Sequence, residues 1–333
     1  MAERSLLGLF ALAFALTMAP VSRVAADEVN YPARPVRVVI PFSAGGSLDL
    51  LARVLAQAVG AQWHQQVLIE NRPGADGELG AAFVARTAPD GYRLLATSQA
   101  IATNLSLHPA RPYDAQKDLS PVMVIASTNS VLFASPSLNV NSVADVIRAA
   151  KAKPGQLNYA SQGLGTSAYW AIELLKHQAG LDILHIPYND YGQQTYDLLG
   201  GDISLVAVTV PQAFGLIGTG RLKPLAVTGS TKSPALPLVS TMQEAGVAGY
   251  EAATWYGLYA PSGTPIRIIN AIHAAFRTAL ESSDVKARLM AIGVEPVGSS
   301  PEYLRDYLAH ETVKWANIMK ASSVPTLTVG SRF

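Results

Sequence analysis

The 333-residue sequence contains no cysteine. This absence excludes disulfide bonds, thiolate zinc sites, a cysteine nucleophile and a lipid-modified N-terminal cysteine. The six histidines form no pair with metal-ligand spacing and a supporting motif, so neither a metal nor a cofactor is predicted. Charged residues are also few, at 15 %, with 25 basic residues against 24 acidic ones. A nearly neutral chain lacks the basic surface that nucleic acids attract, and no nucleic-acid partner is predicted.

Long hydrophobic runs are missing as well, apart from residues 6–19 near the start. That run is too short for a membrane-spanning helix, which needs roughly 20 apolar residues. Arg4 before it, Pro20 after it and the small residues at Val24 and Ala26 are typical of a cleavable signal peptide over residues 1–26. The sequence therefore predicts export to the periplasm of a chain that is not embedded in the membrane.

The chain beyond the predicted signal peptide is formally neutral. Since the signal contains Arg4, Arg23 and Glu3, 25 basic residues less two and 24 acidic residues less one leave 23 of each. The remaining length, about 307 residues (333 less 26), is enough for roughly two domains, each with a core of its own. No lipid-surface partner is expected from a neutral balance, and we expect a monomer.

Short β-branched runs alternate with longer helical patterns, which indicates an α/β fold with a largely parallel sheet. The predicted strands are residues 37–42, 66–70, 92–97, 157–160, 182–187, 203–208 and 222–227. The predicted helices are 48–59, a segment ending at 86, 142–151, 168–178, 193–199, 211–218, 265–281, 284–292 and 301–321. Two crossings near residues 124–130 and 226–232 predict a hinge. Lobe 1 is expected over residues 27–126 plus 229–333, and lobe 2 over residues 127–228.

Two Gly- and Ser-rich turns have the same design, because each follows a strand and leads directly into a helix. Backbone N–H groups at a helix start have no internal partner and carry partial positive charge, and glycine lets a ligand approach them closely. In an α/β sheet such turns lie beyond the carboxyl ends of the strands, where ligands bind. The sequence therefore predicts a site for a small organic anion, one turn per lobe, without lysine or arginine. The predicted ligand-binding residues in these turns are Ser43, Ala44, Gly45, Gly46 and Ser47, and Ser161, Gly163, Gly165, Thr166 and Ser167.

Three other interpretations remain open from the residues alone. Ser47 and Ser167 are suited to act simply as helix N-caps. The sequence Gly163-x-Gly165-x-x-Ala168 also fits a dinucleotide-binding turn, for which Asp182 or Asp190 would have to supply the acid after the next strand. A periplasmic serine hydrolase using Ser161 or Ser167 would need a histidine within hydrogen-bond reach. Glu173 and His177, four residues apart on one predicted helix, are interpreted as a surface pair.

Many segments resemble the tripartite tricarboxylate transporter receptors, also called Bug proteins. The resemblance begins with YPARPVRVVIPFSAGG at residues 31–46, followed by Asp49, Ala52 and Arg53. It continues with ENRPG at 70–74, APDGY at 88–92, YD at 113–114, LNYAS at 157–161, GTS at 165–167, HIPY at 185–188, DLLGG at 197–201, LAVT at 225–228 and YGLYAP at 256–261. The order and spacing of these motifs extend from Tyr31 to Ala321.

The resemblance implies a two-lobed periplasmic-binding-protein type II (Venus flytrap) fold with a hinge and an interlobe cleft. It further implies a receptor without catalytic activity that delivers a carboxylate to a membrane permease or serves signalling. Contacts in this family are expected from the loops matching residues 42–47, 97–99 and 161–167, with contributions near 188–190. These loops add Phe42, Thr97, Ser98, Gln99, Tyr188, Asn189 and Asp190 to the predicted site, and Thr209 completes it.

The sequence departs from the family pattern at three places. Ala207, Val208 and Thr209 stand where Phe-Asp-Asn is common, so an acidic cleft residue is predicted to be apolar. The loop after Tyr188 lacks the usual Lys-Gly-Ser-Ala-Pro, and Asp76 stands where glycine is common. Because the partner for a cation is lost at Val208, the ligand is predicted to lack an ammonium group.

Overall fold

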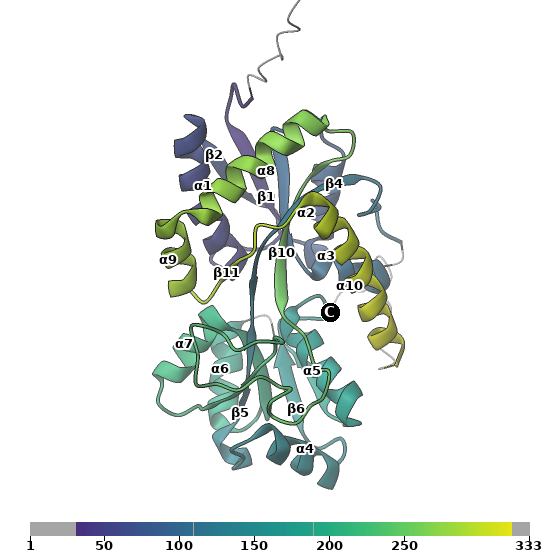
Figure 1. The fold of residues 1–333 in the computed structure, drawn as a ribbon. Helices are drawn as coiled ribbons and strands as arrows, with labels where there is room; N and C mark the ends of the chain where they lie inside the picture. Colours follow the sequence, from purple (N-terminus) through teal and green to yellow (C-terminus); the bar gives the residue numbers. More distant parts are fainter. Residues whose placement is uncertain (1–30, 109, 189, 322–333) are drawn as a thin grey trace, which may run out of the picture. The chain divides into compact units, whose positions relative to one another are not determined.

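The computed structural model describes residues 31–108, 110–188 and 190–321, so the predicted signal peptide lies outside the described residues. Two β-sheets with helices around them form the described part (Figure 1). The first sheet has the strand order β11-β4-β10-β3-β1-β2, and the second has the order β7-β6-β8-β5-β9. The two-lobed α/β fold expected from the sequence is confirmed.

The strands of the first sheet are β1 (Val36–Ile40), β2 (Val67–Asn71), β3 (Arg93–Ser98), β4 (Leu119–Thr128), β10 (Thr254–Pro261) and β11 (Glu295–Pro296). Those of the second sheet are β5 (Ser130–Ala134), β6 (Asn158–Ser161), β7 (Leu184–Pro187), β8 (Leu205–Thr209) and β9 (Pro224–Val227). The helices are α1 (Ser47–Trp63), α2 (Glu78–Ala85), α3 (Ala100–Leu107), α4 (Val143–Ala152), α5 (Ser167–Ala179), α6 (Tyr191–Gly200), α7 (Val210–Gly218), α8 (Ile266–Glu281), α9 (Ser283–Ala291) and α10 (Pro301–Ala321). Short 3₁₀ turns occur at Ala75–Gly77 and Pro136–Leu138.

The prediction of a largely parallel sheet is wrong, because both sheets are mixed. Strands β1, β2 and β3 pair in parallel, as do β6, β7 and β8. Strand β10 pairs antiparallel with both β3 and β4, and β5 pairs antiparallel with β8 and β9. The antiparallel strands are those next to the passages between sheets, where no βαβ crossover sets the strand direction.

The chain passes between the sheets at two places that lie side by side. Strand β4 ends at Thr128 and β5 begins at Ser130, so a single residue, Asn129, separates these strands of different sheets. After β9, the chain stays beside the second sheet through Tyr250, whose hydroxyl donates to the Ala171 carbonyl on α5, and then returns to β10. The return lies next to Thr228, because the Ala252 N–H donates to the Thr228 carbonyl at 2.8 Å. The Thr228 N–H donates to the Ser130 carbonyl at 2.9 Å, and the Ser130 N–H donates to Thr228 Oγ1 at 2.9 Å. The first passage falls within the predicted segment 124–130, whereas the return after Tyr250 lies beyond the predicted segment 226–232.

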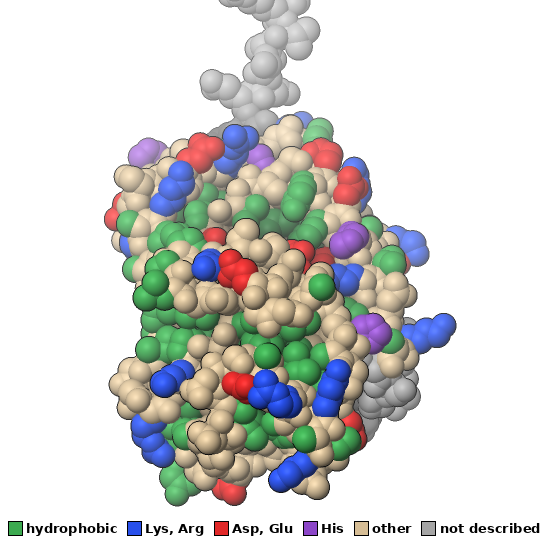
Figure 2. Space-filling view, turned by 60° about the horizontal axis from the view of Figure 1, so that its bottom comes forward, with side chains coloured by type: hydrophobic (Ala, Val, Ile, Leu, Met, Phe, Trp, Pro, Cys, Tyr) green, Lys and Arg blue, Asp and Glu red, His purple; other side chains and the backbone are tan. Residues whose placement is uncertain are grey.

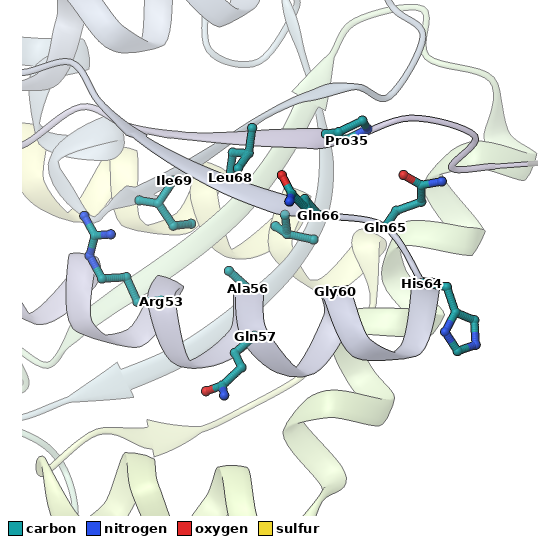
Figure 3. A pocket seen from close by; sticks show the side chains of 11 residues that line it. Pro35, Arg53, Ala56, Gln57, Gly60, His64, Gln65, Gln66, Leu68 and Ile69 are labelled. Atoms are coloured by element: carbon teal, nitrogen blue, oxygen red, sulfur yellow. The ribbon is translucent and has the colours of Figure 1, made fainter.

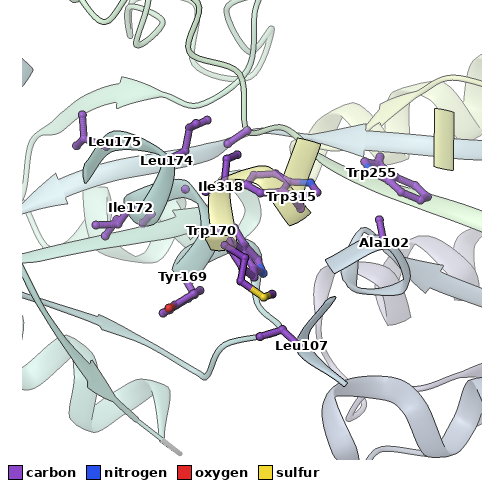
Figure 4. Close-up of a cluster of buried hydrophobic side chains, with 14 of the residues drawn as sticks. Ala102, Leu107, Tyr169, Trp170, Ile172, Leu174, Leu175, Trp255, Trp315 and Ile318 are labelled. Carbon is purple, nitrogen blue, oxygen red and sulfur yellow. The ribbon is translucent and has the colours of Figure 1, made fainter. Parts of the chain in front are cut away.

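One apolar core extends from the first sheet to the second. It contains Val39 and Leu95 of the first sheet and Leu132 and Leu205 of the second. Between them, Trp170 on α5 lies 5.4 Å from Trp315 on α10, measured between ring centroids, and both side chains are fully buried (Figure 4). Helix α10 thus joins the two sheets through aromatic packing.

Most of the predicted helices and strands are present with ends shifted by a few residues. Ser142 caps α4 as predicted, since its side chain accepts from the Asp145 N–H. Helix α3 was not predicted, because it begins directly after β3 with no capping side chain at Gln99. The interpretation of Glu173 and His177 as a surface pair is also wrong. Glu173 is buried and accepts hydrogen bonds from Tyr159 and Lys176.

Candidate functional site

The first Gly- and Ser-rich turn lies where the sequence predicts it, between the end of β1 and the start of α1. Gly45 has a φ of 87°, a left-handed conformation that favours glycine. Residues 43–46 are exposed, and α1 begins at Ser47 after Gly46 as the N-cap. The interpretation of Ser47 as an N-cap is therefore wrong, and its hydroxyl is available for other contacts.

The backbone of this turn is fixed by three side chains, those of Asp49, Arg53 and Asn71. Asp49 Oδ2 accepts from the Gly45 N–H at 2.9 Å, and Arg53 binds both carboxylate oxygens of Asp49 at 2.9 and 3.0 Å. The Asn71 side-chain amide donates to Asp49 Oδ1 and to the Phe42 carbonyl. We call Asp49, Arg53 and Asn71 the loop clamp, since together they fix both ends of the turn. Sequence reasoning missed this role for them, although Asp49 and Arg53 belong to the quoted family motif.

The charge state of the loop clamp follows from these contacts. Burial by itself raises the pKa of the Asp49 carboxyl, but hydrogen bonds from Arg53, Gly45 and Asn71 outweigh it. The positive charge of Arg53 acts in the same direction, and the net result is a lowered pKa. Asp49 is therefore ionised at neutral pH. Its charge is matched by Arg53, so the exposed N–H groups of the turn keep their attraction for an anion.

The second turn follows β6 and leads into α5. Thr166 is the N-cap, and its side chain accepts from the Tyr169 N–H, so the interpretation of Ser167 as the cap is wrong. Gly163 has a φ of 121°, again in the region that favours glycine. Ser161 is fully buried, and its hydroxyl lies 2.8 Å from His185 Nε2 and accepts from the Gly163 N–H. Ser161 therefore supports the turn from beneath.

His185 was not among the predicted site residues, yet it is the support for Ser161. Its ring lies between Tyr159 and Tyr169, each with a centroid distance of 4.9 Å. Burial, with a smaller contribution from the charge of Lys176, lowers its pKa to about 4. A neutral ring at physiological pH serves as a hydrogen-bond partner for the Ser161 hydroxyl. No local sequence pattern reveals this support, because Ser161 and His185 are 24 residues apart and meet only when β6 pairs with β7.

A serine hydrolase needs a histidine beside an accessible serine, and only the first of these conditions is met at Ser161. His185 satisfies the distance requirement for Ser161, whereas the serine hydroxyl is buried and already bonded within its own turn. A dinucleotide-binding turn would need the Asp190 carboxylate for the cofactor. That carboxylate instead caps α6 by accepting from the Gln193 N–H. The geometry favours neither enzyme.

Each of the two turns contacts a residue from the other lobe. Ser47 Oγ, at the start of α1, lies 3.1 Å from Thr209 Oγ1, at the end of β8. Beside this contact, Asp76 reaches Gly165, where an added Cβ would lie 2.8 Å from the Asp76 Cβ. We call these two contacts the interlobe junction. The sequence separation of 162 residues between Ser47 and Thr209 hides this proximity from any local pattern.

Asp76 has a φ of 52°, a left-handed conformation that is uncommon outside glycine but that Asp adopts more often than most residues. Its carboxylate lies 3.2 Å from His108 Nε2, and its carbonyl accepts from the Asn104 side chain at 2.9 Å. The adjacent Gly77 contacts Phe42, since a Cβ there would lie 3.2 Å from the Phe42 ring. Asp76, one of the three places where the sequence departs from the pattern that it resembles, is thus part of the interlobe junction.

The remaining predicted residues are divided between this region and its surroundings. Thr97 and Gln99 are buried at the end of β3, and Ser98 accepts from the Ala100 N–H. Within the described part of the chain, both polar atoms of the Gln99 side chain lack a hydrogen-bond partner. Tyr188 donates to Asp197 and is half-buried. Asn189 lies outside the described residues.

The prediction that Val208 replaces a cleft residue is wrong. Its side chain is 3 % exposed and belongs to an apolar core cluster with Val131, Phe133 and Val210. On strand β8 the side chains alternate, and Thr209 is the residue that reaches the other sheet. The expected loss of a cation partner at Val208 therefore has no basis in the cleft.

A separate hollow of about 1040 Å³ lies along α1 and the edge strand β2 (Figure 3). Arg53, Gln57 and His64 line it from the helix side, and Leu68 and Ile69 from the strand. No residue of the second sheet lines it, so it is distinct from the interlobe junction. On the face shown in Figure 2, acidic and basic side chains are interspersed, in keeping with the balanced charge.

Residues 51–324 match the family model described as "Tripartite tricarboxylate transporter family receptor". The chain belongs to this family. It is 36 % identical to protein BugT of Bordetella pertussis over 318 residues, covering 95 % of this chain and 96 % of that protein. It is 33 % identical to a protein from the tcbD-tcbE intergenic region of Pseudomonas sp. (strain P51), over 92 % of this chain and 91 % of that protein.

Solved structures of relatives have the same fold. R. palustris Rpa4515 with adipate superposes with a TM-score of 0.81 at 34 % identity, covering 90 % of this chain and 100 % of that one. MatC from Rhodopseudomonas palustris with bound malate gives 0.76 at 29 % identity, covering 86 % and 99 %. The periplasmic binding protein BugD gives 0.78 at 28 % identity, covering 90 % and 100 %. The relatives are solute-binding receptors rather than enzymes. No helix in the described ranges is long and apolar enough to cross a membrane.

Proposed function

We propose that this protein is a periplasmic receptor that holds a small organic carboxylate between the turns at residues 43–47 and 161–167. The observation that supports it most directly is the interlobe junction. Ser47 of the first turn contacts Thr209, the N-cap of α7, and Gly165 of the second turn lies against Asp76, so each turn lies at a contact between the two lobes. Peptide dipoles at the starts of α1 and α5 attract negative charge. The Thr209 hydroxyl donates to Gln212 Oε1 and lies 3.1 Å from Ser47 Oγ, so backbone N–H groups are the main donors left for the anion.

Gln99 supports the same proposal. A buried side-chain amide without hydrogen-bond partners is costly, on the order of 1–3 kcal/mol, unless a ligand or an ordered water satisfies it. Gln99 lies at the end of β3, beside β10, whose Tyr256 hydroxyl is near Ser47. We propose that its amide contributes to carboxylate binding, directly or through water.

We further propose a ligand without an ammonium group. The carboxylates nearest the two turns have partners of their own: Asp49 binds Arg53, Asp76 lies against His108, and Asp190 caps α6. An ammonium would have to compete with these contacts. Two relatives are described with adipate and malate, which are plain carboxylates. We also propose that the receptor is monomeric and either delivers its ligand to a membrane permease or serves signalling.

A thermal-shift panel of carboxylates tests the proposal. It should include adipate, malate, succinate, citrate, benzoate, aspartate and glutamate. A ligand at 100 times its dissociation constant adds about 2.7 kcal/mol to the free energy of unfolding. We expect a clear rise in melting temperature with at least one plain acid and a smaller one with aspartate and glutamate. No response to any acid contradicts the receptor proposal, and a preference for the two amino acids contradicts its ammonium part.

A further inference from the structure

A second cavity, of about 160 Å³, lies where the chain passes between the two sheets. Ser127, Thr128 and Asn129 line it from the first passage, and Glu251 and Ala253 line it from the return to β10. Gly229, Ser230 and Thr231, which follow β9, complete this side. Strand β11 and helix α10 provide other walls. None of the residues predicted for the carboxylate site lines this cavity. We call it the hinge cavity.

The chemistry of the hinge cavity is the opposite of the carboxylate site. Its lining includes two carboxylates, Glu251 and Glu295, and no lysine, arginine or histidine. Glu295 is half-buried on β11, and burial raises the pKa of its carboxyl. Across the described ranges of the chain, Glu295 forms no ion pair. A partly buried carboxylate without a cation is unfavourable, and a positively charged ligand would relieve it.

Aromatic rings form another wall of the cavity. Tyr303 and Tyr307 stack with a centroid distance of 5.5 Å and an interplanar angle of 19°. Trp255 meets Tyr307 edge-on at 5.3 Å. Stacked rings beside carboxylates favour an organic cation, because the faces of aromatic rings attract positive charge. The ring wall therefore distinguishes an organic cation from a bare metal ion.

Asn129 gives an independent indication of a hydrogen-bond donor. The residue is 5 % exposed, and its Oδ1 has no hydrogen-bond partner in the described part of the protein. This oxygen lies against Gly229, another residue of the cavity wall, where an added Cβ would be only 2.0 Å away. A buried acceptor of this kind calls for an N–H donor.

We infer that the hinge cavity binds a small primary amine in its ammonium form. The ammonium N–H groups would be accepted by Glu295 and by Asn129 Oδ1, and the alkyl group would lie against Tyr303 and Tyr307. Because the cavity wall includes both passages between the sheets, a bound amine would favour one arrangement of the lobes. By linkage, amine and carboxylate would then change each other's affinity by the same factor. The amine site itself does not depend on the identity of the carboxylate ligand.

Isothermal titration calorimetry of the exported full-length protein with n-propylammonium chloride tests this inference. We expect saturable binding, weaker binding of tetramethylammonium, which has no N–H donor, and none of n-propanol, which has no charge. Glu295→Gln should weaken n-propylammonium binding about tenfold or more, the loss expected for a charge-assisted hydrogen bond. Glu302→Gln is the matched control, since Glu302 is exposed on α10 outside the cavity and should leave affinity unchanged.

Two results overturn the inference. One is the absence of saturable heat with n-propylammonium in wild-type protein that still responds to a carboxylate. The other is unchanged n-propylammonium affinity in the Glu295→Gln variant. Circular dichroism and the carboxylate thermal shift establish that each variant is folded. Tyr307→Leu gives a second test at the aromatic wall and should also weaken binding. If no carboxylate raises the melting temperature but n-propylammonium still binds, only the carboxylate proposal is contradicted. The two proposals can therefore be tested separately.

Discussion

Gly165, in the second turn, lies against Asp76 of the other lobe. An added Cβ would lie 2.8 Å from the Cβ of Asp76 and 3.0 Å from its Cγ, closer than side chains normally pack. Gly46 is different, because an added Cβ there meets only the Ser43 carbonyl at 3.9 Å. A side chain is therefore excluded at Gly165 and at Gly46 for different reasons. Gly165 is constrained by the other lobe, and Gly46 by any approach of a ligand to the backbone.

Gly165→Ala should weaken carboxylate binding by preventing the contact with Asp76, and Asp76→Gly in the same chain should restore much of it. Isothermal titration calorimetry of the two single variants and the double variant measures the coupling. Gly215→Ala is the control, because Gly215 is exposed on α7 with nothing within 4 Å of an added Cβ. Equal losses in the Gly165→Ala protein with and without Asp76→Gly would show that this contact does not limit binding.

Gln99→Met should separate stability from binding. Replacing a buried amide without partners by an apolar side chain of similar size should raise the free energy of unfolding by about 1 kcal/mol. The same change should weaken carboxylate binding, because the amide is lost. Chemical denaturation and calorimetry measure the two effects. Gln116→Met, at an exposed position, should change neither. A variant that binds as well as wild type would remove Gln99 from the site.

At the scale of elements, each turn is held by residues of neighbouring strands and helices. The first is fixed by the loop clamp, which joins α1 to β2, and the second by His185 on β7. In each turn, the support contacts the buried side, and the exposed side remains accessible to a ligand. An anion site made of backbone N–H groups needs such supports, because the backbone must be positioned before the ligand arrives.

Asp49→Asn should destabilise the protein by about 1–3 kcal/mol at neutral pH, because it removes a buried carboxylate that accepts four hydrogen bonds. The pKa of Asp49 is lower in the folded state than its unfolded value of about 3.9. Its stabilisation is therefore complete above that pH and is lost as the pH falls through the folded-state pKa. Urea denaturation from pH 7 into acid should show the gap between wild type and variant narrowing below pH about 4. Asp306→Asn, an exposed change, should show no gap.

His185 predicts a different pH dependence. Its pKa is lowered from 6.5 to about 4 on folding, so the unfolded chain takes up a proton before the folded protein does. Stability should therefore fall as the pH decreases from 6.5 toward 4, and His185→Gln should reduce that slope. Melting temperatures across this range measure it. His177→Gln on α5 is exposed and should keep the wild-type slope. An unchanged slope in the His185 variant would contradict the assignment.

At the scale of the whole described structure, the two sheets share an apolar core. The Trp170–Trp315 contact joins α5 to α10, and the core cluster around it includes residues of both sheets. Lobes that share a core unfold together more readily than lobes joined only by a linker. Any movement of the lobes must also accommodate this aromatic contact.

We therefore expect one cooperative thermal transition in scanning calorimetry, with equal calorimetric and van't Hoff enthalpies. Trp315→Ala should cost about 3–5 kcal/mol and broaden or split the transition, because it removes the aromatic link between the sheets. Trp63→Ala on α1 is the comparison, since Trp63 packs against Phe276 of the same lobe, and it should leave a single transition. Two transitions in the wild-type protein would contradict a shared core.

Sequence reasoning was most successful where the signal is local. The strand–turn–helix units at residues 36–63 and 158–179 are visible because hydrophobic period, glycine and hydroxyl residues change together within each unit. It failed at the strand directions, because β10 and β5 take their partners from distant parts of the chain. It also failed at Ser47 and Ser167, where the cap is one residue earlier, and at α3, which has no capping signal.

The sequence by itself determined the family, the α/β alternation and the two amide-lined turns, since each depends on residues close together in the chain. Only the tertiary structure decided that Ser47 meets Thr209, that Asp76 lies against Gly165, that His185 supports Ser161 and that Val208 is in the core. These contacts join residues far apart in sequence or depend on which face of a strand is buried. Local periodicity contains no information about such pairing, which is fixed when the sheets and helices pack.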